Sequence, residues 1–393
     1  MRVQHKKLHL GLLALLSVAL SNPLGAEPTT TPSKPNPVWE VNLKAYGFRT
    51  FRRGFVNDYG SSASLACTRG TVAVAFDSMA DYIGNSATGQ SQWSGSWNVV
   101  VLFFARDSAR LLAKKSWLGD LRSELLATPS GNFILHLERL EATRQGHRLP
   151  PGALILLSPL GEELKRVDLP LDPNKRHEWW EVQASPSGQS LLLMHHLENL
   201  RQYQFYDVDT LEPGSGWTEA SGDDIPNRVI SISDHQILRT STTKGEWRIY
   251  LGRSESVGRE IIEDSRVSGV PRFLSDDLLI VTRRNPFQIG VLRQPGEEVL
   301  LYREPTGGAH NWSDQPIVSA DGVHLAAEID VGAKSFFSMS RAFIYIWKVP
   351  EPGPVQVLQI SPPSVWGPMM TLSPEGNCLV VIDKAKLRLL RVP

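Results

Sequence analysis

A short turn followed by an apolar run recurs seven times in this sequence, at intervals of about 51 residues. The turns have the form Ser/Thr-x-x-Gly, or a shortened form with Asp, which is typical of tight hairpins. A repeat of this length predicts a fold assembled from similar units that stand side by side. The turns lie at 67–70, 128–131, 185–188, 233–235, 275–277, 319–322 and 373–376.

The apolar runs after the turns are mostly unbroken, as in TVAVAF, NFILHL and SLLLMH. A strand has this pattern when both of its faces are covered, whereas alternation is expected when one face meets water. In a radial stack of sheets, each sheet is covered on both sides by its neighbours. The sequence therefore predicts an all-β fold with seven four-stranded units, a seven-bladed β-propeller.

The two ends of the repeat array indicate how the ring closes. The seventh unit ends with 386–391, which would be its third strand, so this unit lacks a fourth strand. A strand-like segment, YGFRTFRR at 46–53, precedes the first unit and belongs to none. Pairing these two segments would remove two open sheet edges. We therefore expect 46–53 to lie beside 386–392, so that an N-terminal strand closes the last blade.

Several short motifs resemble those of the WD40-like, YVTN and TolB-type propellers of exported bacterial proteins. They are the Ser-Pro-x-Gly turns at 185–188 and 373–376, the Ser-Ala-Asp-Gly turn at 319–322, and the strand end Tyr-Asp-Val-Asp-Thr at 206–210. The resemblance covers most of residues 46–393 and implies the propeller architecture. It implies no particular activity, because propellers with different functions share these motifs.

The first 26 residues have the layout of a secretory signal peptide. A positively charged segment at 2–7 precedes an apolar run at 8–20, and small residues follow up to Ala26. The run is short for a membrane-spanning helix, although an uncleaved anchor is the alternative, and no later segment is long and apolar enough. We expect cleavage near Ala26, a Pro/Thr-rich flexible leader at 27–40 and one propeller domain at 41–393. The mature protein would be periplasmic or extracellular.

The composition excludes several classes of function. Lys and Arg number 41, as do Asp and Glu, so the formal net charge is zero. This balance argues against a nucleic-acid-binding protein, and two cysteines are too few for a four-cysteine zinc site. Cys67 and Cys378 belong to units that a closed ring makes neighbours. Because one precedes its turn and the other follows it, we do not expect a disulfide between them.

The loops that lead into the innermost strands carry aromatic and polar residues. In a propeller these loops surround one mouth of the central channel. Aromatic faces beside carboxylates, imidazoles and amides suit peptides, sugars or flat ligands. We expect a ligand-binding funnel here, with packing between blades as the alternative role for the same rings. The funnel residues would be Tyr59, Trp117, Trp179, Trp180, Trp312 and Trp366.

Some polar residues of these loops are candidates for acid–base catalysis, which needs at least a carboxylate beside a histidine. They are His177, Glu178, Asp224, Arg266 and His310. The sequence contains no P-loop, GxGxxG or GxSxG motif. The run HEWWE at 177–181 lacks the second histidine of a zinc-binding helix, and His195 and His196 would point to opposite faces of a strand. We therefore expect no metal site and no cofactor.

These observations favour an exported, non-catalytic scaffold that binds a protein or peptide partner on its channel face. Two alternatives stay open. One is a propeller enzyme, either lactonase-like or a glycan-acting hydrolase or lyase, and the other is a carbohydrate-binding module that uses the aromatic funnel. Convergence of His177, Asp224 and His310 on one pocket would favour the enzyme, and their separation around an open rim would favour docking.

Overall fold

The computed structural model describes most of the chain beyond the N-terminal segment. The described residues are 32–50, 63–78, 81–85, 90–94, 98–118, 121–139, 151–172, 178–220, 226–243, 246–251, 259–263, 271–283, 287–293, 297–303, 316–331, 341–361 and 369–393. Their regular structure is almost entirely strand, with one 3₁₀ helix, η1 (Leu43–Tyr46). Over these ranges, no helix has the length and apolar character needed to cross a membrane.

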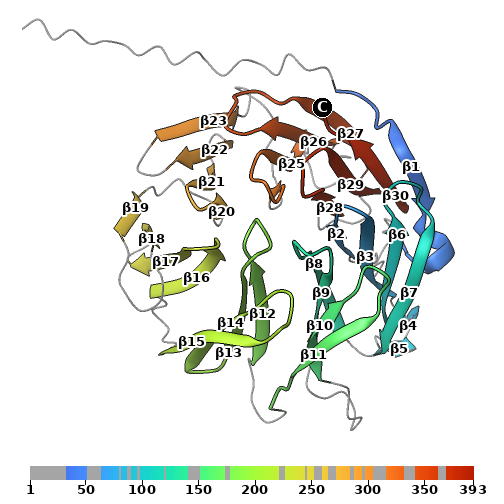
Figure 1. The fold of residues 1–393 in the computed structure, drawn as a ribbon, viewed down its shortest axis with the longest axis horizontal. Coiled ribbons are helices and arrows are strands. Elements are labelled where there is room, and N and C mark those ends of the chain that lie inside the picture. The colour runs from blue at the N-terminus through green and yellow to red at the C-terminus, as the bar shows by residue number, and fades with distance from the viewer. Residues whose placement is uncertain are drawn as a thin grey trace, which may run out of the picture.

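The strands form seven four-stranded antiparallel sheets, which surround a central space (Figure 1). We number these blades along the chain and give each from its innermost to its outermost strand. Blade 1 contains β2 (Ala63–Cys67), β3 (Thr71–Ser78), β6 (Asn98–Ala105) and β7 (Leu111–Leu118); blade 2 contains β8 (Leu121–Ala127), β9 (Phe133–Arg139), β10 (Gly152–Leu157) and β11 (Glu163–Leu169); blade 3 contains β12 (Trp179–Ala184), β13 (Leu191–His196), β14 (Leu200–Tyr206) and β15 (Pro213–Ala220).

The second half of the ring continues in the same order. Blade 4 contains β16 (Pro226–Ile232), β17 (Ile237–Thr243), β18 (Glu246–Leu251) and β19 (Arg259–Glu263); blade 5 contains β20 (Arg272–Ser275), β21 (Leu278–Arg283), β22 (Gln288–Arg293) and β23 (Glu297–Arg303); blade 6 contains β24 (Ile317–Val318), β25 (His324–Val331), β26 (Arg341–Lys348) and β27 (Gln356–Ile360); blade 7 contains β28 (Met369–Leu372), β29 (Cys378–Asp383), β30 (Lys386–Arg391) and β1 (Pro37–Asn42).

The expected fold class, seven like units closed by 46–53, requires a correction at blade 7, because this blade is assembled from both ends of the chain. Six blades are each built from one continuous stretch of chain, and the seventh four-stranded sheet joins both ends of the chain. Its outermost strand is β1, which pairs with β30 from Trp39–Leu389 to Asn42–Lys386, so the predicted closing segment 46–53 is wrong. Residues 43–46 form η1, Gly47 ends it with φ +96°, and 51–53 lie outside the described residues.

The closing strand also shortens the predicted leader, because residues 37–40 lie in β1. Its side chains alternate between half-buried and exposed, and Trp39 and Val41 face the apolar cluster between blades 7 and 1. The prolines around this segment hide that alternation in the sequence.

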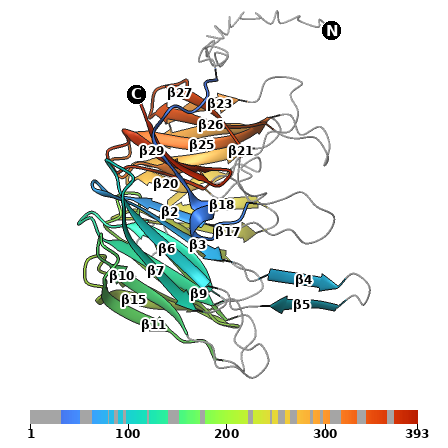
Figure 2. The ribbon, with the colours of Figure 1, turned by 90° about the vertical axis from the view of Figure 1, so that its right-hand side faces the viewer.

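The ring also carries a hairpin of β4 (Asp81–Asn85) and β5 (Gln90–Ser94), which projects from it in Figure 2. It lies in the chain segment that connects β3 to β6.

The unbroken apolar runs have the predicted cause. In β3, Val72 and Val74 pack into the cluster shared with blade 7. Ala73 and Ala75, which alternate with them, pack into the cluster shared with blade 2. All four side chains are fully buried. Each sheet is therefore sandwiched between two neighbours, and hydrophobic burial on both faces holds the ring together.

The seven predicted turns all connect the innermost strand of a blade to its second strand. We call the end of the propeller that they occupy the turn face, and the opposite end, where the innermost strands begin, the entry face. The turns also tie neighbouring blades together. Ser187 of blade 3 donates to Asp234 of blade 4 at 2.7 Å, and the backbone N–H of His235 in blade 4 donates to Asp276 of blade 5 at 3.2 Å.

One turn glycine is required by a close approach between blades. Gly188 has φ +74°, and a Cβ added there would lie 2.9 Å from the backbone oxygen of Ala127 in blade 2. Gly131 has φ +91° in the equivalent turn of blade 2, with nothing within 4 Å of its added Cβ. We expect Gly188→Ala to lower the free energy of unfolding by roughly 2 kcal/mol and Gly131→Ala by roughly 1 kcal/mol. Urea unfolding measures both, and equal losses would contradict a steric role for Gly188.

Candidate functional site

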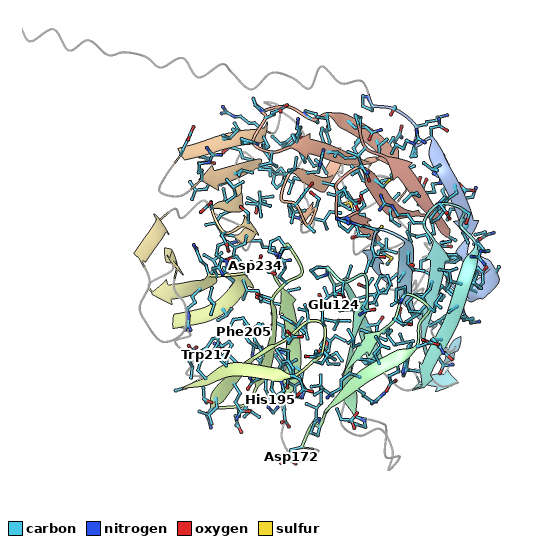
Figure 3. All side chains as sticks on the ribbon, in the orientation of Figure 1. Glu124, Asp172, His195, Phe205, Trp217 and Asp234 are labelled. Carbon is cyan, nitrogen blue, oxygen red and sulfur yellow. The ribbon has the colours of Figure 1, made fainter. Side chains whose placement is uncertain are left out.

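A crevice of about 440 Å³ opens between blades 2 and 3, toward the entry face. Its blade 2 wall comes from β8 and β9, its blade 3 wall comes from β12, and Ser64 of blade 1 borders it. Figure 3 shows Glu124 of blade 2 directed toward the central space, with His195 farther out on blade 3. The polar and aromatic lining residues are Ser64, Ser123, Glu124, His136, Glu138, Trp179, Trp180 and Glu181.

Two tryptophans of β12 are held by histidines of the neighbouring strand β13. The strand register pairs Trp179 with His196 and Trp180 with His195. The rings of each pair are stacked, with centroids 4.4 Å apart for Trp179–His196 and 3.8 Å apart for Trp180–His195. The two pairs lie on opposite faces of blade 3, because successive side chains of a strand alternate. Stacking of this kind fixes the indoles in position before any ligand arrives.

A carboxylate supports each of the two histidines. Glu178 lies 2.7 Å from Nε2 of His195, and Glu181 lies 3.1 Å from Nε2 of His196. Glu178 also accepts the backbone N–H of Asp172 at 2.7 Å, and its side chain is only 5% exposed. These contacts make a Glu–His–Trp series on each face of the blade. The sequence HEWWE with a later HH pair therefore encodes two supported aromatic rings.

The blade 2 wall of the crevice is acidic. Glu124 of β8 and His136 of β9 are register partners, so their side chains lie on the same face of the sheet. Nδ1 of His136 is 4.0 Å from a carboxylate oxygen of Glu124, and Glu138 follows His136 on the same face. The His136 side chain is 4% exposed, and its Nε2 atom has no hydrogen-bond partner in the structure. Glu124, by contrast, is half exposed.

The charges of two carboxylates at this crevice act on a guanidinium group of blade 5. Burial lowers the pKa of Arg272 at the start of β20, and the nearby charges of Glu124 and Glu181 act in the opposite direction. Glu124 belongs to blade 2 and Glu181 to blade 3, so charges from two blades act on an arginine of a third blade.

The structure brings together only some of the predicted funnel residues. Trp179 and Trp180 border the crevice. Trp117 lies on the outermost strand of blade 1, packs partly against an apolar cluster and does not line the crevice. Tyr59, Trp312 and Trp366 lie outside the described residues.

The structure describes only one of the five predicted acid–base candidates. His177, Asp224, Arg266 and His310 lie outside the described residues, so their convergence on one pocket stays a prediction. Glu178 is described, and its carboxylate is buried against His195 and the Asp172 N–H. This arrangement fits a residue that orients His195. Across the described ranges, no cluster of three or more His, Cys, Asp or Glu side chains could hold a metal ion.

Sequence reasoning missed the acidic wall of the crevice. Glu124, His136, Glu138 and Glu181 all lie within strands, whereas the candidates predicted from the sequence were assigned to loops. One signal was available: His136 interrupts the otherwise apolar run NFILHL, which should be covered on both faces. A polar residue in such a run must find a partner or face a cavity. The cross-strand pairing that brings Glu124 to it requires the strand register.

A larger basin lies at the turn face. It has a volume of about 850 Å³ and is lined by the inner turns of blades 1, 2, 3, 6 and 7. The hydroxyls that line it mostly bond within or between turns, as Thr128 does to Ser130 at 2.8 Å and Ser187 to Asp234 at 2.7 Å. Those polar groups are thus committed to holding the turns, which distinguishes this basin from the crevice.

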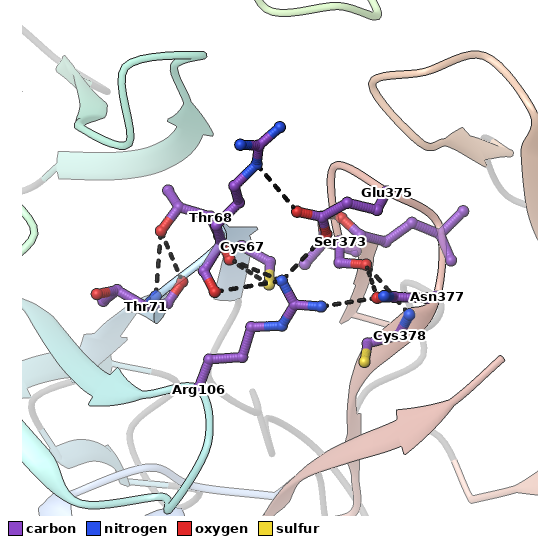
Figure 4. A network of polar contacts seen from close by, with 11 residues as sticks. Cys67, Thr68, Thr71, Arg106, Ser373, Glu375, Asn377 and Cys378 are labelled. Atoms are coloured by element: carbon purple, nitrogen blue, oxygen red, sulfur yellow. Dashed lines mark hydrogen bonds and ion pairs between the residues drawn. The ribbon is translucent and has the colours of Figure 1, made fainter.

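The two cysteines lie at the junction of blades 1 and 7, near the guanidinium of Arg106 (Figure 4). Both are free thiols in the structure. Cys67 is buried, and burial is the main cause that raises its pKa to about 12. A thiol with such a pKa stays protonated and unreactive at neutral pH. We therefore assign Cys67 a packing role at the junction.

Comparison with known proteins finds only distant similarities among solved structures. No protein-family model matches the chain, and no curated protein matches it. The β-propeller domain of the Trilobed protease from Pyrococcus furiosus is similar, with 11% identity, a TM-score of 0.48, and coverage of 84% of this chain and 91% of that chain. TolB from Acinetobacter baumannii gives 14% identity, a TM-score of 0.38, and coverage of 77% and 78%. The Dos1 propeller gives 10%, 0.41, and coverage of 88% and 95%.

Proposed function

We propose that this protein is an exported, non-catalytic β-propeller that binds a protein or peptide partner at the entry face of its channel. The observation that carries the proposal is the pair of pre-positioned indoles of Trp179 and Trp180, next to an acidic crevice. Aromatic anchors beside polar groups in a concave, already formed site are typical of binding surfaces. The N-terminal sequence, with its charged segment, apolar run and small residues up to Ala26, supports export.

The polar groups of the crevice favour binding over catalysis. The buried carboxylate of Glu178 and the half-buried one of Glu181 each contact a histidine that stacks on an indole. Such contacts leave the rings fixed and the histidines committed to them. A site with rigid aromatic walls loses little conformational entropy when a partner binds.

Carbohydrate binding is the second candidate, and one observation favours it. The Trp179 side chain is 39% exposed although a histidine covers one side of its ring. A flat indole supported from behind can pack against the apolar face of a sugar ring. Titration of the intrinsic tryptophan fluorescence with a panel of oligosaccharides tests this candidate, and a saturable response that Trp179→Ala abolishes would support it.

Photocross-linking tests the proposed partner binding directly. A photoreactive benzoylphenylalanine is placed at position 179, and the protein is irradiated together with the exported fraction of the source cells. We expect one or a few discrete adducts, because a specific partner would cover this position. We also expect Trp179→Ala to weaken capture of that partner at least about tenfold, since interface tryptophans are frequent energetic hot spots.

The matched control places the same photoreactive residue at position 164. Leu164 lies on β11, the outermost strand of blade 2, and is 51% exposed. It is therefore accessible to solvent but remote from the crevice. Adducts at 179 that are absent at 164 support the proposal. Identical adduct patterns at the two positions, or none at 179, would contradict it.

A further inference from the structure

We propose that Arg272 binds a carboxylate of the partner at the entry face of the channel. This inference rests on the proposed function and names the chemical group of the partner that is recognised. The carboxylate belongs to an acidic side chain or to a chain terminus, because both present the same planar pair of acceptor oxygens to a guanidinium. Three features of the described residues support the inference.

The first feature is the position of Arg272 on the wall of the channel. It is the first residue of β20, the innermost strand of blade 5, and innermost strands begin at the entry face (Figure 1). The next residue fixes the backbone, because Phe273 is 3% exposed and its N–H donates to Oγ of Ser231 in blade 4 at 3.1 Å. Glu124 and Glu181, whose charges act on Arg272, lie on the innermost strands of blades 2 and 3. The guanidinium is therefore directed toward the central space that these strands surround.

The second feature is the lack of a partner within the described part of the chain. Nε of Arg272 is buried and has no hydrogen-bond partner there, and none of the described carboxylates forms an ion pair with this side chain. A buried donor without an acceptor costs free energy. The residue as a whole is only half-buried, so a ligand in the central space can reach it. A bound carboxylate would accept two hydrogen bonds from the guanidinium side by side.

The third feature is a positive charge that the protein compensates only in part. Burial has the largest effect on the pKa of Arg272 and lowers it, although the charges of Glu124 and Glu181 act to raise it. The two carboxylates therefore replace only part of the hydration that the guanidinium has lost. An anion in direct contact would supply more, because the attraction between opposite charges grows as their distance falls.

The same two carboxylates repel an incoming anion, which gives the inference a signed prediction. Glu181 lies 3.1 Å from Nε2 of His196 and accepts from Gln183 at 3.2 Å, and Glu124 is half exposed, so that solvent screens its charge. We therefore expect the contact with Arg272 to exceed this repulsion. Removal of the charge of Glu124 should strengthen carboxylate binding, whereas it would weaken the binding of a cation.

The test uses two pairs of short peptides, each pair differing in the charge of one group. Ac-Gly-Asp-Gly-NH₂ presents a side-chain carboxylate and Ac-Gly-Asn-Gly-NH₂ is its neutral counterpart; Ac-Gly-Gly-Gly-OH presents a terminal carboxylate and Ac-Gly-Gly-Gly-NH₂ is its counterpart. Each peptide is titrated into the full chain labelled with ¹⁵N at arginine, and the Nε–H signal of Arg272 is followed by NMR. We expect a saturable shift with at least one carboxylate peptide and binding at least about tenfold weaker with its neutral counterpart. The pair that responds identifies a side chain or a terminus as the source.

Matched variants locate the site, and ligand-observed NMR measures the binding of the carboxylate peptide to each of them. Arg272→Gln should weaken binding at least about tenfold, since it removes the charge and the planar donor fork. Glu124→Gln should strengthen binding severalfold. Arg293→Gln removes an exposed arginine at the end of β22 in the same blade and should leave binding unchanged. Circular dichroism verifies that each variant is folded.

Urea unfolding distinguishes a binding role of Arg272 from a structural role. An arginine that holds the fold through its contacts is needed for stability, whereas an unpaired guanidinium that is partly desolvated opposes folding. We therefore expect the urea midpoint of Arg272→Gln to equal or exceed that of the unmodified protein. A lower midpoint would contradict the inference, because it would show that the guanidinium stabilises the ring.

The remaining outcomes separate this inference from the proposed function. Equal binding of the charged and neutral peptides in both pairs, no shift of the Arg272 signal, or unchanged binding to Arg272→Gln would overturn the carboxylate site. If cross-linking at position 179 still captured a discrete partner in that case, partner binding would stand without it. Loss of both results would remove the two proposals together.

Discussion

Replacing Val41 with aspartate is expected to lower the free energy of unfolding by about 3 kcal/mol. Val41 lies in β1, the strand that closes the ring, and packs on the apolar cluster between blades 7 and 1. A carboxylate at this position would have to be buried without a partner or would pull β1 away from β30. Detachment of β1 would also expose the edge of β30 and the apolar side chains beneath it. Urea unfolding followed by tryptophan fluorescence measures the loss.

Val38 provides the matched control for this variant. It lies three residues earlier in the same strand, but its side chain points outward and is 44% exposed. Val38→Asp introduces the same charge and the same loss of β propensity, so its expected cost is below about 0.5 kcal/mol. Equal losses of unfolding free energy for the two variants would contradict the proposed role of Val41 in packing at the closure of the ring.

Local sequence patterns explain why the predicted closing segment was 46–53 and not β1. The alternation in PVWEVN is short and follows a stretch rich in proline, which is typical of a leader. The later segment 46–53 has a stronger strand composition. Pairing with β30 depends on where the chain can reach, and η1 with Gly47 redirects the chain directly after β1. Local patterns do not encode that constraint.

The rest of the ring could be predicted because each repeat contains the same information. A turn such as Ser185–Gly188 followed by the run SLLLMH determines two strands and their connection within one unit. Burial on both faces then follows from the absence of alternation. The crevice is different, because Glu124, His136 and Trp180 come from three strands of two blades. Their proximity depends on register and on packing between blades, which single repeats do not reveal.

Replacing Arg106 with leucine is expected to cost about 2–4 kcal/mol. The Arg106 side chain is 13% exposed and connects blade 1 to blade 7 (Figure 4). It donates to the backbone oxygen of Thr68 at 3.3 Å, to Glu375 at 3.1 Å and to Asn377 at 2.7 Å. Leucine would remove all the hydrogen bonds that the guanidinium makes across this partly buried junction, although Arg69 would still pair with Glu375 and Ser373 would still donate to Asn377. Thermal and urea unfolding both measure the change.

Arg110→Leu controls for the loss of a positive charge on the same connection. Arg110 follows Arg106 by four residues between β6 and β7 and is exposed, so its expected cost is below about 0.5 kcal/mol. The backbone oxygen of Arg106 also accepts the indole N–H of Trp39 at 2.7 Å, which links the closing strand to blade 1. Because leucine keeps that backbone contact, the variant isolates the guanidinium. Similar losses for both variants would mean that net charge, and not the junction, sets the stability here.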